Sequence, residues 1–183
     1  MKLTDLVIDL FEKEECPYEQ SEEGTEFRIY FHGRHSSFST LIFVDEDECI
    51  LRTYSKCSVK IPKHKLSAIT ELIARINLEL YIGNFDLDID ERIALFRTAM
   101  KICTDNPGQH TVGTLIFGNC FSMDRFSPVI ASVIYGNISP KKAIDLFPDY
   151  DDEISEEQGD KSSENNSPKD IYFNRRRGLF TDN

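Results

Sequence analysis

The chain has 183 residues, a size typical of one domain with a short appendage. Its net charge of −11 argues against DNA, RNA or an anionic membrane surface as the main partner, since these are bound by clustered Lys and Arg. The apolar stretches are too short for a membrane span, and acids interrupt the N-terminal run where a signal peptide would be apolar, so we expect a cytoplasmic protein.

The first third of the chain predicts one helix followed by strands. Apolar residues recur at helical spacing, which predicts a helix over about Thr4–Glu15 with Thr4 as its N-cap. We expect a polar, acidic connection from there to Gly24. Three strand-like runs with turn-like links then indicate an antiparallel meander: Phe27 to Phe31, Phe38 to Val44 and Cys49 to Ser55.

The next hundred residues predict a second helix, a hairpin and further helices. Pro62 opens a helix with one apolar face that runs to about Tyr81, and Gly83 follows as a stop. A hairpin follows at Phe85–Ile102. Two glycines and a proline interrupt the helical pattern after it, so we expect two separate helical pieces, Gln109–Phe121 and Asp124–Tyr135. A short last helix covers Pro140–Leu146. The order α-βββ-α-ββ-α-α predicts an α+β fold with an antiparallel five-stranded sheet and helices mainly on one face.

The composition changes after residue 148, so we divide the chain into a domain, 1–148, and a tail, 149–183. Residues 149–170 hold nine acids, two lysines and almost no apolar side chains, and this predicts a flexible, largely disordered tether. Residues 171–180 carry apolar side chains around three arginines, and they form either a docking segment or more of a disordered terminus. The apolar anchors of that segment are Tyr172, Phe173, Leu179 and Phe180.

No pattern in the sequence indicates a catalytic residue, a cofactor or a metal. The five cysteines lack CxxC spacing, so we expect reduced thiols without a disulfide or zinc. Asp86, Asp88 and Asp90 do not fit a calcium loop, and we interpret them as a solvated strand face. Nothing in the spacing of His110 and Cys120 shows a base beside an activated thiol.

Aromatic and aliphatic side chains fall on both faces of the predicted meander. Tyr30 and Tyr54 alternate with the main apolar positions of their strands, as do Leu41 and Phe43. Such a two-sided sheet needs cover from helices of the same chain, from a second subunit or from a partner.

Four motifs in order resemble the YbjN-like family over about residues 1–147: Ile82–Asp90, Arg97-Thr98, Asp124-Arg125-Phe126 and Ile134–Pro140. Members of that family are described as bacterial sensory transduction regulators, and their fold resembles that of type III secretion chaperones. Those chaperones are homodimers that hold an extended segment of a client protein, and their dimer is built from the middle helix and the second hairpin, here Pro62–Tyr81 and Phe85–Ile102. The family has no established catalytic residues to carry over.

The resemblance implies a non-enzymatic protein-binding module, either chaperone-like or a regulatory adaptor, that forms a homodimer. We expect a protein client, no nucleic acid or membrane partner, and no small-molecule substrate. The expected partner-binding residues in the domain are Tyr54, Phe85, Leu87 and Phe96. An enzyme with an unrecognised site and a structural protein that acts through self-association remain the alternatives.

Overall fold

The computed structural model describes residues 2–102 and 108–147. The elements in chain order are α1 (Leu3–Lys13), β1 (Tyr18–Gln20), β2 (Glu26–His32), β3 (Ser37–Asp45), β4 (Ile50–Lys56), the 3₁₀ turn η1 (Lys63–Lys65), α2 (Leu66–Asn77), β5 (Asn84–Asp88), β6 (Ile93–Lys101), α3 (Gln109–Tyr135) and α4 (Pro140–Asp145). The predicted α+β class is confirmed. The predictions about residues 148–183, including the docking segment, lie outside the described residues.

The sheet is open and antiparallel, with six strands in the order β1-β2-β3-β4-β6-β5. The predicted count of five strands is wrong because β1 pairs with β2 within the expected connection. Three residues are too few to show an alternation in the sequence, and pairing with the edge of β2 makes them a strand.

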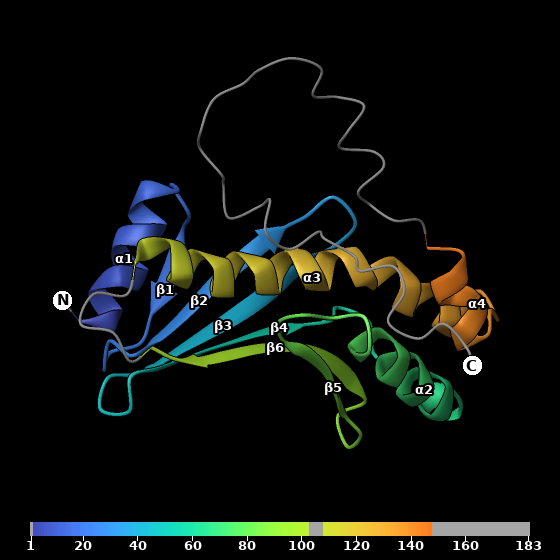
Figure 1. The fold of residues 1–183 in the computed structure, drawn as a ribbon. Helices are drawn as coiled ribbons and strands as arrows, with labels where there is room; N and C mark the ends of the chain where they lie inside the picture. Colours follow the sequence, from blue (N-terminus) through green and yellow to red (C-terminus); the bar gives the residue numbers. More distant parts are fainter. Residues whose placement is uncertain (1, 103–107, 148–183) are drawn as a thin grey trace, which may run out of the picture.

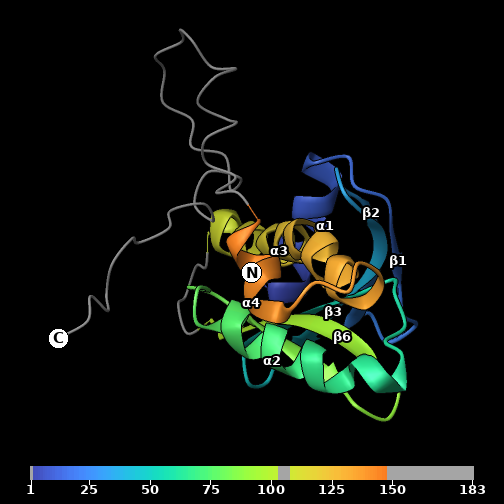
Figure 2. The same ribbon diagram turned by 90° about the vertical axis from the view of Figure 1, so that its right-hand side faces the viewer.

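The helices lie on one face of this sheet and at one of its ends. Figures 1 and 2 show α3 along the face, with α1 near one end of α3 and α2 and α4 near the other. The fully buried rings of Phe11, Phe27, Phe85 and Phe96 are part of the core between these layers. Within the described residues, no helix combines the length and the apolar content that a membrane crossing needs.

The prediction of two helical pieces after residue 108 is wrong, because α3 is one helix of 27 residues. At 1.5 Å per residue it is about 40 Å long. Gly113 and Gly118 are buried within it, and Pro128 removes a single backbone donor. The free-energy cost of these residues in a helix is smaller than the gain from burying the apolar face of α3 along the whole sheet.

Two helix ends also differ from the predictions. Thr4 does not cap α1; the carboxylate of Glu46, in the turn after β3, accepts from the amides of Leu3 (3.1 Å) and Thr4 (2.7 Å). The second helix spans Leu66–Asn77 rather than Pro62–Tyr81, since η1 precedes it and the Asn77 side chain bonds the backbone of β5.

Candidate functional site: the open face of the sheet

The strands bury one face against the helices and leave the other partly exposed. Residues alternate between buried and exposed along β2, β3, β4 and the first part of β6. We call the exposed side of β2 to β6 the open face; no helix of the described residues lies across it (Figure 1). The strand register places one row of its residues side by side across five strands: Arg28, Leu41, Tyr54, Arg97 and Asn84.

Apolar side chains occupy the centre of the open face. Leu41, Phe43, Tyr54 and Leu95 are only partly buried there. The rings of Phe43 and Tyr54 pack edge to face, 5.8 Å apart, so these two side chains support each other. Tyr30, at the outer part of the face, is 58% exposed.

Three arginines surround this apolar centre. Arg28 pairs with Glu19 at 3.3 Å, Arg97 pairs with Asp86 at 3.0 Å, and Arg52 is exposed between Phe43 and Ala99 in the register. Tyr and Arg are the residues enriched in the energetic centres of protein interfaces. The open face therefore has the composition of a protein-binding surface.

The Gly83-Asn84-Phe85 motif shapes one edge of this surface. Gly83 has φ +78°, and a Cβ there would lie 2.7 Å from the Arg97 carbonyl oxygen, so no other residue fits without strain. Asn84 then donates to Asp86 (2.6 Å) and accepts weakly from Arg97 (3.5 Å). These bonds and the ion pair with Asp86 orient Arg97 beside Tyr54.

The expected partner-binding residues are divided between the surface and the core. Tyr54 lies on the open face, and Leu87 is half-buried against the core. Phe85 and Phe96 are fully buried, with ring centroids 4.8 Å apart, and neither presents a side chain to a partner in this conformation. Tyr172, Phe173, Leu179 and Phe180 lie outside the described residues.

The sequence interpretation missed Leu95 and the arginine row. The signal was present in the alternation of β2 and β6, where Arg28 and Arg97 share the pleat side of Tyr30 and Leu95. Only the register shows that Arg28 and Arg97 lie in one row with Tyr54.

Cys120 and His110 do not form a nucleophile and its base. Both lie on α3, ten residues apart, which separates them by about 15 Å along the helix axis. Cys120 is fully buried, and this burial raises the pKa of its thiol to about 12, against a hydrogen bond from Thr40 that lowers it. The thiol is therefore protonated and inaccessible.

Two of the three aspartates of the second hairpin have structural partners. Asp86 pairs with Arg97, and Asp88 accepts from the amide of Glu91 (2.8 Å), which closes the turn. Across residues 2–102 and 108–147, no three His, Cys, Asp or Glu side chains lie close enough together to hold a metal ion.

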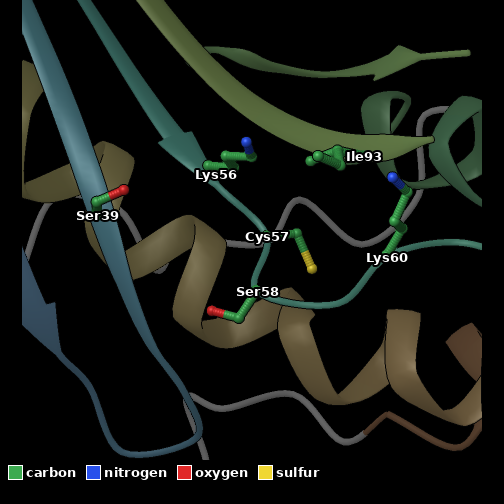
Figure 3. Close-up of a pocket in the computed structure, with 6 residues that line it drawn as sticks. All are labelled: Ser39, Lys56, Cys57, Ser58, Lys60 and Ile93. Atoms are coloured by element: carbon green, nitrogen blue, oxygen red, sulfur yellow. The ribbon is translucent and has the colours of Figure 1, made fainter. Parts of the chain in front are cut away.

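A small pocket lies at one margin of the open face (Figure 3). It has a cavity volume of about 200 Å³ and is lined by Ser39, Lys56, Cys57, Ser58, Lys60 and Ile93. Two of its six lining residues are cationic and none is acidic. Burial raises the pKa of the Cys57 thiol, so the pocket holds a neutral SH group beside two ammonium groups.

Comparison with known proteins gives a family. Residues 4–115, more than half of the chain, match the model of the YbjN family, described as "Putative bacterial sensory transduction regulator". The match ends before Asp124–Phe126 and Ile134–Pro140, so it is shorter than the predicted span of 1–147. No curated protein matches the chain. The matched span includes every strand of the sheet and the Gly83-Asn84-Phe85 motif, and the chain belongs to the YbjN family.

Proposed function

We propose that this protein is a non-enzymatic, cytoplasmic regulatory adaptor that binds a protein client on the open face of its sheet. The observation that carries the proposal is the apolar centre of Leu41, Phe43, Tyr54 and Leu95 on a face without helix cover in the described residues. Membership in a family of regulators supports a binding role. The order of helices and strands is also compatible with the chaperone-like fold that the resemblance implies.

The charges of the open face indicate the chemistry of the client. Arg28, Arg52 and Arg97 surround the apolar centre, and Arg52 has no carboxylate partner among the described residues. Apolar side chains flanked by carboxylates would complement this surface. The client is therefore a protein segment with aromatic or aliphatic anchors and neighbouring acids.

Site-specific photo-cross-linking tests the proposal. A photoreactive phenylalanine at position 54 should capture one dominant protein in cells of the source organism. The same residue at position 135 is the control, because Tyr135 is 71% exposed at the far end of α3, away from the open face. Equal capture at both positions would remove the open face as the binding surface.

Affinity measurements with the captured protein complete the test. Tyr54→Ala and Leu41→Asp should each weaken binding at least about tenfold, the effect of removing an interface centre. Tyr135→Ala should leave the affinity unchanged. An unchanged affinity for Tyr54→Ala, with the fold intact by circular dichroism, would reject the proposed client surface.

A homodimer is our second proposal, and exposed apolar residues near α2 and the second hairpin support it. Leu78 is 86% exposed, Tyr81 62% and Ile89 64%. In sedimentation at micromolar concentration, the wild-type protein should have about twice the chain mass, and Leu78→Ser with Tyr81→Ser should give a monomer. A wild-type monomer at high concentration would reject this dimer, and a dimer without any client would favour the self-assembly alternative.

A further inference from the structure

The pocket in Figure 3 belongs to the most basic part of an acidic protein. Residues 49–70 contain no Asp or Glu, and they form the longest acid-free stretch of the chain. Within it, we call residues 56–65 the basic segment, since they hold Lys56, Lys60, Lys63 and Lys65. The net charge of the whole chain is −11, so this concentration of cations is local.

None of these four lysines has a carboxylate partner among the described residues, and Lys56, Lys60 and Lys63 are exposed. Figure 3 shows Lys56 and Lys60 at the pocket, with Ile93 between them in this view. Two ammonium groups and the Ser39 and Ser58 hydroxyls can bind a carboxylate, although the Ser58 hydroxyl already donates to the Ser37 carbonyl (2.6 Å).

The complementary charge is present in the same chain. Residues 149–160, which we call the acidic segment, hold seven acids and neither Lys nor Arg: Asp149, Asp151, Asp152, Glu153, Glu156, Glu157 and Asp160. Residues 171–180, which the sequence offers either as a docking segment or as part of a disordered terminus, carry three arginines instead, and the basic pocket repels them.

The connection between the two segments is short. Lys65 donates to Asn137 Oδ1 (3.0 Å), which joins the end of the basic segment to the loop before α4. α4 packs against α2, and the described chain ends at Phe147, two residues before the first acid. α2, which follows the basic segment directly, is about 18 Å long. A coil of twelve residues spans about 20 Å, so the acidic segment can reach along the whole of α2.

We propose that the acidic segment 149–160 of this chain docks on the basic segment and places a carboxylate in the pocket of Lys56 and Lys60. The covalent connection supplies an effective concentration in the millimolar range, so docking needs an affinity of only about 1 mM. Ser39, Lys56 and Ile93 belong to the open-face side of their strands. The docked segment therefore covers one margin of the open face and competes there with an acidic client.

Amide NMR on the full chain tests the docking. In the wild-type protein, about 0.5 M salt reduces the screening length to about 4 Å and should release the acidic segment. At low salt, the amides of residues 56–65 in E153Q/E156Q/E157Q should shift toward the positions that they have in this released wild-type protein. The matched control, E12Q/E14Q/E15Q, removes the same charge at the end of α1 and should leave those amides in place. Unmoved amides in the tail variant would overturn the proposal.

The reciprocal variants give an independent readout. K56Q/K60Q should shift the amides of residues 149–160, whereas K2Q/K13Q, with the same charge change on α1, should not. Shifts that do not change on dilution support docking within one chain. Shifts that disappear on dilution show the acidic segment of a second copy in the pocket, and they overturn docking within the chain. Neither outcome depends on whether a client binds the open face.

Discussion

The carboxylate of Asp124 joins α3 to the turn between β2 and β3. It accepts hydrogen bonds from the amides of Arg34 (2.9 Å), His35 (3.0 Å) and Ser36 (2.7 Å). The residue before Arg34 must be glycine, because a Cβ on Gly33 would lie 2.3 Å from the Asp124 carboxyl group. One buried anion therefore satisfies the donors of a whole turn.

We predict that Asp124→Asn destabilises the protein by about 1–3 kcal/mol, because the amide has one acceptor oxygen and leaves part-buried donors unsatisfied. Urea unfolding measures the change. Asp145→Asn is the control, since the partner of Asp145 within the described residues is Lys141 in an exposed pair, and it should change stability by less than about 0.5 kcal/mol. Equal effects of the two variants would contradict the role of the turn.

Glu46 makes the stability of the protein depend on pH. Partial desolvation by burial acts to raise its pKa, but hydrogen bonds from the hydroxyl and amide of Thr4 and the amide of Leu3 outweigh it, and the pKa is lowered. A lowered pKa means that the folded state favours the ionised form. This contribution is present above the unfolded pKa and is lost as the pH falls through the folded one.

We therefore expect Glu46→Gln to destabilise the protein at pH 7 and to do so less and less as the solution becomes acidic. Urea unfolding of the wild type and the variant, from pH 7 downward, measures the difference in their free energies of unfolding. Asp47→Asn, in the same turn, is the control at pH 7, and it should destabilise the protein less than Glu46→Gln because no hydrogen bond from α1 to Asp47 is found among the described residues. A constant gap between Glu46→Gln and wild type would show that the carboxylate charge is not what stabilises α1.

At the scale of the elements, the Asn77 side chain occupies part of the free edge of β5. Its Oδ1 accepts from the Phe85 amide (2.8 Å), and its Nδ2 donates to the Phe85 carbonyl (3.0 Å). These are the two bonds that a neighbouring strand would make. The amide group thus blocks strand addition at this position of an edge strand.

We predict that Asn77→Ala lowers the free energy of unfolding by about 1–2 kcal/mol and opens the edge to pairing with other chains. Hydrogen exchange should become faster at the Phe85 amide, and light scattering should rise with concentration. Thr70→Ala, on the exposed side of α2, serves as the control. Unchanged exchange at Phe85 would mean that Asn77 does not protect the edge.

The elements that the sequence predicts are those whose signal is local. Periodicity gave α1, α2 and the second hairpin, but it could not give β1 or the continuity of α3, because pairing and burial outweigh a weak local preference there. Capping by Glu46 was hidden for the same reason, since it acts on a helix 42 residues away.

For the candidate site, alternation set Leu41, Phe43 and Tyr54 opposite the main apolar positions of their own strands, and the register brings the three side chains onto one face. Alternation shows that a strand has two faces, but it does not show which face is covered. Phe85 and Phe96 were therefore expected at a partner surface, whereas Phe126 of α3 packs on Phe85 and takes that place.

At the scale of the whole molecule, a line of buried polar groups fixes α3 on the sheet. Asn119 donates to the carbonyls of Thr53 and Phe96, both at 3.0 Å, and Thr98 donates to the Leu115 carbonyl (2.9 Å). These bonds join α3 to β4 and β6. A shift of the helix along the sheet would break them in a dry interior, so its position is well defined.

Cys120 reports on the release of α3, since its thiol lies under the helix. A pKa of about 12 leaves about 10⁻⁴ of the thiol ionised at pH 8. We predict that iodoacetamide modifies the exposed Cys49 at once and Cys120 only on global unfolding. The labelling of Cys120 should therefore depend on urea concentration in the same way as the unfolding of the whole protein. Mass spectrometry of labelled peptides measures both, and rapid labelling of Cys120 without urea would contradict this.

The position of α3 in the chain has a consequence for biosynthesis. All six strands emerge from the ribosome before this helix, and the face that it covers stays wet until the helix has been made. A ribosome that stalls while α3 is still inside the exit tunnel would present a nascent sheet with Ile42 and Phe96 open to solvent. Holdase chaperones should therefore bind this nascent chain late in translation, and they should dissociate once the helix has emerged and folded onto the sheet.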